Sequence, residues 1–159
     1  MSGNRLKLLS LSAAAVLAAL TFTAGPALAA PAHSVLSAGA RARSVPLRIR
    51  AFRWAESQRG KPYEYGGTGP SSYDCSGLVM EAYLHVGIRL PRTTYEMLSS
   101  RDLVWVRHPK KGDLAFYGSG HVELYAHGDW TYGAHAAGQP VGWIQFGPWW
   151  HPTAYYRIR

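Results

Sequence analysis

The stretch from Tyr63 to Val79, which reads Tyr-Glu-Tyr-Gly-Gly-Thr-Gly-Pro-Ser-Ser-Tyr-Asp-Cys-Ser-Gly-Leu-Val, decides how the rest of the chain is interpreted. It passes from a loop rich in Gly, Pro and Ser into a segment with helical periodicity. Apolar residues recur at the spacing of one helical face, namely Leu78, Val79, Ala82, Tyr83 and Val86. Asp74 is a suitable N-cap and Gly87 a suitable stop. The stretch therefore predicts a helix that begins at Cys75.

Cys75 is the only cysteine of the 159-residue chain, and the predicted helix places it in the first turn. In that position the helix dipole and the free backbone N–H groups lower the pKa of a thiol and can stabilise an oxyanion. Gly77, in the same turn, leaves room for another backbone or a substrate to approach closely. This position makes Cys75 a candidate nucleophile, with an inert core cysteine as the alternative.

The N-terminal region has the pattern of a secretory signal peptide. Residues 1–29 combine basic Arg5 and Lys7, an apolar run and a small-x-small cleavage site. We expect export to the cell wall or the medium with no membrane span in the mature form, and an uncleaved membrane anchor is the alternative. Residues 30–47 then form a flexible linker, and residues 48–159 form one catalytic domain.

Charge and cysteine content narrow the classes of partner. The formal net charge is +8, and it falls to about +6 when Arg5 and Lys7 leave with the signal peptide. Such a charge favours anionic partners, and export makes wall polymers more suitable than nucleic acid, which we exclude. The cations are scattered, so an ordinary solvated surface is the alternative.

A lone cysteine in an oxidising compartment cannot form an internal disulfide, which favours a reactive thiol or an intermolecular partner. We expect a monomer.

The remaining segments predict an α+β fold. Residues 48–59 form an amphipathic helix that ends at Gly60, and residues 93–99 form a short helix. After these the period changes to two, and turn signals separate strands at 102–106, 114–117, 121–126, 130–136, 141–146 and 155–158. Because helices come first and strands follow with short connections, we expect N-terminal helices packed on a five- to six-stranded antiparallel sheet.

Two histidines are candidates to serve the thiol. A cysteine nucleophile needs a base within hydrogen-bonding reach and a group that orients the base. His121 starts a predicted strand, and a hairpin turn at residues 128–129 brings His135 back beside it. Spacing therefore nominates Cys75, His121 and His135 as one site. No metal or cofactor is expected, because these residues lack zinc-type spacing and the glycine run at 66–69 lacks the continuation of a phosphate-binding loop.

The motifs, taken in order and spacing, resemble those of the NlpC-type bacterial cell-wall cysteine peptidases. The matching segments are Pro62-Tyr63-x-Tyr65-Gly66-Gly67, Asp74-Cys75-Ser76-Gly77-Leu78-Val79, Leu90-Pro91-Arg92-Thr93, Lys111-Gly112-Asp113-Leu114, Gly120-His121-Val122 and Ala134-His135-Ala136. The resemblance covers about residues 48–158.

The resemblance implies a papain-like α+β fold and hydrolysis of peptidoglycan stem peptides at the bond from γ-D-glutamyl to diaminopimelate or lysine. With Cys75 as nucleophile, we expect the reaction to pass through a thioester acyl-enzyme. The resemblance implies Cys75 as nucleophile, His121 as general base and His135 as the residue that orients the imidazole. On the substrate side, it implies that Tyr63 contacts the substrate or the oxyanion, and that Asp74 and Ser76 help to receive the stem peptide.

Two departures from the family pattern leave rate and substrate preference open. Glu123 stands two residues after His121, where the family commonly has Gly, and Glu96-Met97 stand where it often has Gln. Two other functions also stay open. One is an N-acetylmuramoyl-L-alanine amidase that uses the same residues. The other is a non-catalytic wall-binding or inhibitor protein, indicated by the basic charge and by Trp143, Trp149 and Trp150.

Overall fold

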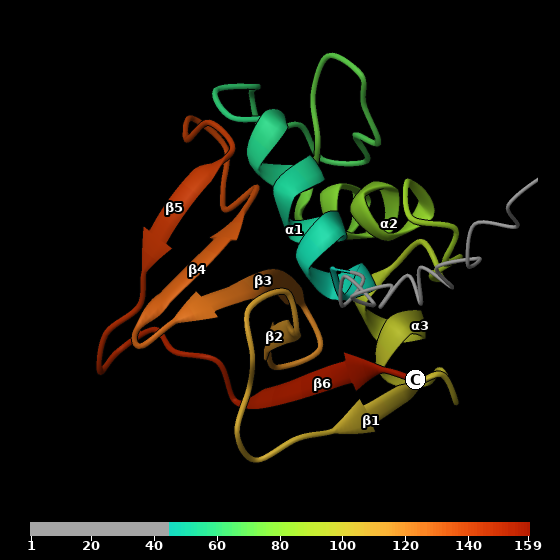
Figure 1. Ribbon diagram of the computed structural model, residues 1–159. Coiled ribbons are helices and arrows are strands. Elements are labelled where there is room, and N and C mark those ends of the chain that lie inside the picture. Colours follow the sequence, from blue (N-terminus) through green and yellow to red (C-terminus); the bar gives the residue numbers. More distant parts are fainter. Residues whose placement is uncertain (1–44) are drawn as a thin grey trace, which may run out of the picture. The chain divides into compact units, whose positions relative to one another are not determined.

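The computed structural model describes residues 45–159 as three helices followed by six strands (Figure 1). The helices are α1 (Leu47–Ser57), α2 (Cys75–Leu84) and α3 (Thr94–Leu98), and the strands are β1 (Leu103–Trp105), β2 (Leu114–Tyr117), β3 (His121–His127), β4 (Trp130–Gly133), β5 (Gly142–Gln145) and β6 (Ala154–Ile158). The predicted signal peptide and most of the predicted linker lie outside the described residues. Within 45–159, every helix is too short or too polar to cross a bilayer.

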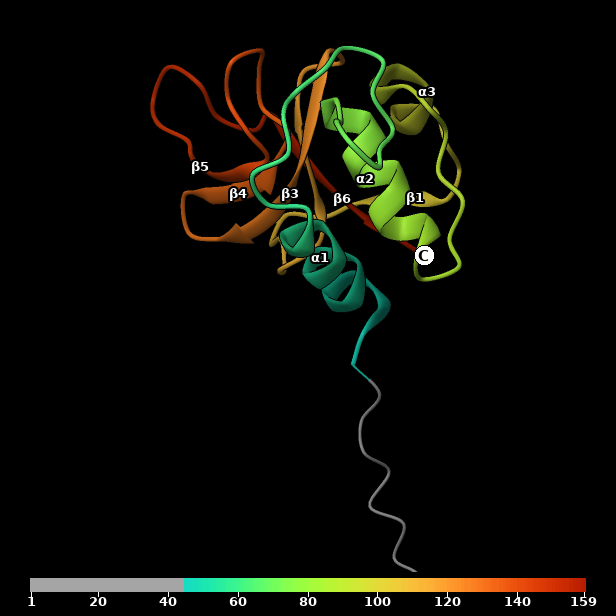
Figure 2. The same cartoon turned by 90° about the horizontal axis from the view of Figure 1, so that it is seen from above.

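The six strands form one antiparallel sheet in the order β1-β6-β2-β3-β4-β5. Figure 1 shows that the sheet is strongly twisted, so that β1 and β6 run across the direction of β4 and β5. Figure 2 shows α1 and α2 together on one side of β3 and β4. The expectation of helices packed on an antiparallel sheet is therefore confirmed, with six strands.

The alternation along β3 separates a core face from a second buried face. Val122 and Leu124 have no exposed surface and pack with Phe52 and Val79 of the helices. Glu123, between them in sequence, points to the opposite face and is also fully buried. A carboxylate without water around it needs hydrogen-bond partners, and these come from the neighbouring strands, as described below.

The start of α2 forms as the sequence predicts, because a side chain replaces the missing partners of its first turn. The carboxylate of Asp74 accepts a hydrogen bond from the backbone N–H of Gly77 at 2.7 Å. A Cβ atom at position 77 would overlap the carbonyl oxygen of Gly67. Glycine at this position therefore allows the preceding loop to lie directly on the helix, which confirms the close backbone approach that was expected there.

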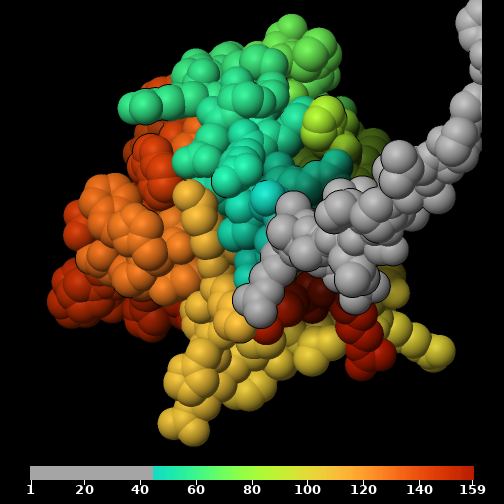
Figure 3. All heavy atoms as spheres, viewed as in Figure 1, coloured from blue at the N-terminus to red at the C-terminus, as the bar shows by residue number. Residues whose placement is uncertain are grey.

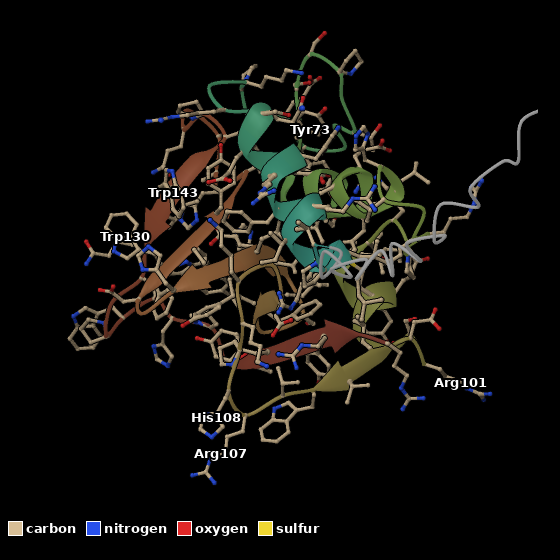
Figure 4. The ribbon with its side chains drawn as sticks, in the orientation of Figure 1. Tyr73, Arg101, Arg107, His108, Trp130 and Trp143 are labelled. Carbon is tan, nitrogen blue, oxygen red and sulfur yellow. The ribbon has the colours of Figure 1, made fainter. Side chains whose placement is uncertain are left out.

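The loop between α1 and α2 is fastened to α1 by Tyr73. Its ring packs edge-on against Trp54, and its hydroxyl donates to the Oε1 atom of Gln58 at 3.1 Å. Figure 4 shows Tyr73 at the junction of α1 and this loop. The loop that precedes Cys75 thus has a defined position relative to α2, and it forms one wall of the site described below.

The strand predicted at 130–136 is shorter in the structure, because β4 ends at Gly133. The reason is a change of pairing partner. Gly133 is still opposite Gly142 of β5, but the backbone of Val141 bonds to Lys61 and Gly60 instead of continuing the ladder with β4. His135 consequently lies in the loop after β4 rather than in the strand.

Basic side chains around the edge strand β1 are dispersed. Figure 4 shows Arg107 and His108 pointing away from the body at the turn after β1, and Arg101 at the other end of that strand. The same turn projects from the face shown in Figure 3. These residues form no compact cationic patch, which agrees with the solvated-surface alternative for this part of the described chain.

Candidate active site

The start of α2 and the start of β3 meet at an open pocket of about 460 Å³. Figure 2 shows α2 alongside β3. Five of the six residues predicted to form a site line this pocket: Tyr63, Asp74, Cys75, Ser76 and His121. The sixth, His135, does not line it. The structure thus brings together the thiol, the candidate base and the predicted substrate-contacting residues, although they come from three separate segments of the chain.

The thiol of Cys75 and the imidazole of His121 face each other in the pocket. Cys75 is 8% exposed. Burial raises the pKa of the Cys75 thiol, but the hydrogen bond and charge of His121, together with the backbone N–H of Val122, lower it more. The pair therefore favours the thiolate, which is the nucleophilic form of cysteine.

The pKa of His121 moves in the opposite direction. Burial lowers it, but hydrogen bonds to Cys75 and to Glu123 outweigh burial and raise the pKa of His121 to about 9. A lowered thiol pKa and a raised imidazole pKa both shift the pair towards thiolate and imidazolium. Such a pair holds both the nucleophile and the proton that a leaving group needs.

The first turn of α2 supplies donors beside the thiol. The backbone N–H groups of Cys75 and Ser76 donate to no described residue, as is normal for the first turn of a helix. They are therefore free to bind an oxyanion. Tyr63 lines the same pocket, and burial, followed by the charges of Cys75 and Asp74, raises the pKa of its hydroxyl. The hydroxyl stays protonated and can donate a hydrogen bond.

Asp74 is held firmly by its neighbours. Its carboxylate accepts from the N–H of Gly66 at 2.9 Å, from the N–H of Gly77, and from two nitrogens of Arg92 at 2.6 and 3.1 Å. Burial raises the pKa of Asp74, but Arg92 and the two N–H groups outweigh burial and lower the pKa, so the carboxylate is ionised. Asp74 therefore joins the loop, the helix and Arg92, in addition to lining the pocket.

Arg92 and Thr94 belong to the pocket although the sequence did not single out their side chains. Arg92 also donates to the hydroxyl of Ser76 at 3.0 Å, and 34% of its side chain is exposed. The hydroxyl of Thr94 lies 4.0 Å from the sulfur of Cys75. Arg92 belongs to the Leu90–Thr93 motif and Thr94 follows it directly, but the motif alone did not show that this segment faces residues 16 to 19 positions earlier across the same pocket.

Glu123 lies between His121 and His135. Its Oε1 atom is 2.9 Å from Nε2 of His121 and 2.8 Å from Nδ1 of His135. The sequence led us to expect that His135 orients His121 directly. In the structure the two rings are neighbours, with centroids 5.3 Å apart, but the group that contacts Nε2 of His121 is the carboxylate.

His121, Glu123 and His135 are also the one group of described residues close enough to hold a metal ion, with candidate atoms within 4.8 Å of one another. The hairpin predicted that His121 and His135 lie close together, but it did not predict that Glu123 lies between them. Both nitrogens lie at hydrogen-bonding distance from the same oxygen. An oxygen in that position occupies the space between the nitrogens, so the geometry is that of a hydrogen-bonded network.

Trp150 packs against this network. Its ring stacks on Tyr117 with centroids 4.7 Å apart and lies 5.7 Å from the ring of His121 and 5.6 Å from that of His135. Trp149 beside it is 97% exposed. Of the two aromatics, Trp150 has a structural role that its sequence context did not reveal, whereas Trp149 projects into solvent.

Comparison with known proteins gives a consistent family. The model of the NlpC/P60 family matches residues 60–146. The peptidoglycan endopeptidase RipB of Mycobacterium tuberculosis is 37% identical over 119 residues, which cover 64% of this chain and 49% of RipB. The probable endopeptidase p60 of Listeria monocytogenes is 43% identical over 77 residues, which cover 45% of this chain and 16% of p60. The chain thus spans about half the length of RipB and a smaller part of p60.

Solved structures agree. The NlpC/p60 domain of the peptidoglycan hydrolase SagA superimposes with a TM-score of 0.62 at 29% identity, covering 70% of this chain and 98% of that domain. The structure of RipB from Mycobacterium tuberculosis gives a TM-score of 0.62 at 28% identity, covering 71% of this chain and 65% of that one. The papain-like α+β fold that the motifs implied is thereby confirmed.

Proposed function

The chain belongs to the NlpC/P60 family, and from this premise we propose that it is a cysteine endopeptidase that cleaves peptidoglycan. The observation that carries the proposal is that Cys75 and His121 lie together in one open pocket, beside the free N–H groups of a helix start. Nucleophile, proton carrier and oxyanion donors are the three parts that acyl transfer to a thiol requires.

The reaction proceeds through a thioester. The Cys75 thiolate attacks the carbonyl carbon of the scissile amide, and the developing oxyanion is held by the N–H groups at the start of α2 and by the hydroxyl of Tyr63. The C–N bond breaks as His121 transfers its proton to the leaving amine. His121 then takes a proton from water, the resulting hydroxide attacks the thioester, and the carboxylic acid leaves with Cys75 restored as a thiolate.

The substrate is a stem peptide, and the bond is the one from γ-D-glutamyl to diaminopimelate or lysine. Beside the thiol, the pocket wall holds the Asp74 carboxylate, the Arg92 guanidinium and the Ser76 hydroxyl. These groups support a substrate peptide that carries both positive and negative groups. Ser76 and Arg92 receive polar ends of the peptide, and Asp74 fixes Arg92 in position. The net positive charge favours approach to anionic wall polymers.

Export remains part of the proposal. Residues 1–29 direct the chain out of the cytoplasm, residues 30–47 connect to the catalytic domain, and the enzyme acts as a monomer in the wall. Fractionation of producing cells tests this. The catalytic domain should be found in the wall or medium fraction, and a full-length chain retained in the cytoplasm would contradict it.

Digestion of purified peptidoglycan tests the activity. Wild-type protein should release fragments that mass spectrometry identifies as products of cleavage inside the stem peptide, and Cys75→Ala should release none while remaining folded. The chain has a single cysteine, so no second thiol can replace Cys75 in that variant. Free stem peptides that keep their N-terminal alanine would instead indicate the amidase. Binding to the wall with no fragments, and a Cys75 that does not react with thiol reagents, would indicate the non-catalytic protein.

A further inference from the structure

Given the proposed function, we propose that Glu123 is the positioning residue of this active site: its buried carboxylate orients His121, and His135 acts only through Glu123. This reverses the roles that the motifs implied, where His135 was expected to orient the imidazole. The inference rests on which atoms touch, on how the carboxylate is held, and on the glycine that makes room for it.

The contact with Glu123 determines which nitrogen of His121 faces the thiol. Nε2 lies 2.9 Å from the Oε1 atom of Glu123, so this nitrogen carries a proton and donates to the carboxylate. Nδ1 is then the nitrogen left to interact with Cys75. A single carboxylate thus sets both the tautomer and the ring orientation, and it stabilises the imidazolium that forms when the thiolate is generated.

Glu123 is itself held in place from two further strands. Its Oε2 atom accepts from the hydroxyl of Tyr117 on β2 at 3.0 Å and from the hydroxyl of Thr131 on β4. The residue has no exposed surface. A carboxylate with both oxygens bonded and no access to water cannot rotate away from His121 without leaving buried donors unpaired.

Gly133 provides the space for this side chain. A Cβ atom at position 133 would lie 2.8 Å from the Cγ atom of Glu123, closer than any ordinary contact. The strand opposite Glu123 therefore carries the one residue type that leaves its side chain undisturbed. Glu123 and Gly133 form a matched pair across β3 and β4.

His135 is an outer partner. Its Nδ1 atom contacts the same Oε1 atom at 2.8 Å, and 20% of its side chain is exposed. It contributes a further donor to the carboxylate but makes no hydrogen bond to His121. The groups that face Glu123 are thus His121 from β3, Tyr117 from β2, Thr131 from β4 and His135 from the following loop, and the ring of Trp150 packs against the two histidines.

The test uses a readout that does not depend on the substrate: the rate of Cys75 alkylation by iodoacetamide as a function of pH. We expect Glu123→Gln to move the alkylation profile to higher pH by about one pH unit or more, because loss of the carboxylate destabilises the imidazolium that stabilises the thiolate. His135→Ala should move it by less than about half a pH unit. Glu81→Gln, on α2 and outside the pocket, is the matched control and should leave it unchanged.

Hydrolysis of peptidoglycan gives the second readout. Glu123→Gln should lower kcat by about 10²- to 10⁴-fold with a smaller change in KM, as expected for loss of the group that orients a catalytic histidine. His135→Ala should lower kcat by less than about 10-fold. Circular dichroism and thermal melts establish that each variant is folded.

The outcomes distinguish a failure of the positioning role of Glu123 from a failure of the proposed peptidase function. A His135→Ala variant that equals or exceeds Glu123→Gln in either readout overturns the assignment of Glu123. If Glu123→Gln does not fold, Glu123→Asp takes its place, because it keeps the charge on a shorter chain; its shift should still exceed that of His135→Ala, and a smaller shift overturns the assignment. If the wild type cleaves no peptidoglycan but the alkylation profiles differ as expected, the proposed function fails and the positioning role stands.

Discussion

Replacement of Gly133 by Ala is expected to destabilise the protein only while Glu123 is present. The added Cβ atom would lie 2.8, 3.2 and 3.4 Å from the Cγ, Cβ and Cδ atoms of Glu123. The side chain of Glu123 cannot withdraw, because hydrogen bonds hold both of its oxygens. Overpacking of this kind costs about 1–3 kcal/mol. Gly133 does not have a positive φ angle, so alanine itself introduces no backbone strain.

The destabilisation caused by Gly133→Ala should largely disappear in a Glu123→Ala background. Truncation removes the Cγ and Cδ atoms, and of the three nearest contacts it leaves the one of 3.2 Å between the two Cβ atoms, which a shift of a few tenths of an ångström relieves. Replacing glycine by alanine also lowers the entropy of the unfolded chain, which stabilises by about 0.4–1 kcal/mol. The double-mutant cycle should therefore show a coupling energy of about 1–3 kcal/mol between the two positions.

Urea denaturation of the wild type, the two single variants and the double variant measures this coupling, with equal m-values as the condition for comparison. Gly142→Ala is the matched control, because Gly142 is the partner of Gly133 in β5 and its added Cβ would make only an ordinary contact at 3.6 Å. We expect the control to change the free energy of unfolding by less than about 1 kcal/mol in both backgrounds. Additive effects of Gly133→Ala and Glu123→Ala would refute the matched-pair reasoning.

Three further predictions concern pH and buried polar groups. Burial raises the pKa of Glu123, but hydrogen bonds from His121, His135 and Thr131 outweigh burial and lower the pKa from 4.5 to about 2. Because the pKa is depressed in the folded state, ionised Glu123 stabilises the folded protein by about 3 kcal/mol above pH 4.5. This stabilisation is lost as the pH falls towards 2. The difference in unfolding free energy between wild type and Glu123→Gln should thus shrink by about 2 kcal/mol from pH 6 to pH 3, and a constant difference would contradict the assignment. Asp74→Asn should destabilise by about 1–3 kcal/mol in thermal melts, because it removes the charge paired with Arg92 and replaces one acceptor oxygen by an amide nitrogen that cannot accept from Arg92 or Gly66, and an unchanged melting temperature would show that these contacts contribute little. Tyr83→Phe should cost about 1–3 kcal/mol, because it leaves the buried carbonyl of Gly112 without the hydroxyl that donates to it at 2.6 Å, while Cys75 alkylation stays at the wild-type rate.

Local patterns were sufficient for the elements that carry the nucleophile. The polar cap at Asp74 and the apolar spacing after Cys75 predicted the start of α2, because both depend on residues within one or two turns. Alternation predicted the positions of the strands, since one face of each strand must be buried. The hairpin after His127 then brought His135 near His121, because antiparallel pairing returns the chain to where it started.

The contacts among side chains could not be derived in this way. Alternation placed Glu123 on the same face as His121, yet whether Glu123 or His135 touches the imidazole depends on the room left by Gly133 and on the early end of β4. Likewise, Arg92 reaches Asp74 from 18 residues away and Trp150 packs against His121 from the loop before β6.

Local sequence thus specified the helix, the strands and the position of the thiol at the helix start. Short-range hydrogen bonds and the periodicity of burial act over only a few residues. The identity of the group behind His121 depended on packing between strands. A carboxylate can be buried there only where hydroxyl donors from β2 and β4 converge and a glycine leaves the space, and those three conditions are met by residues that have no common motif in the sequence.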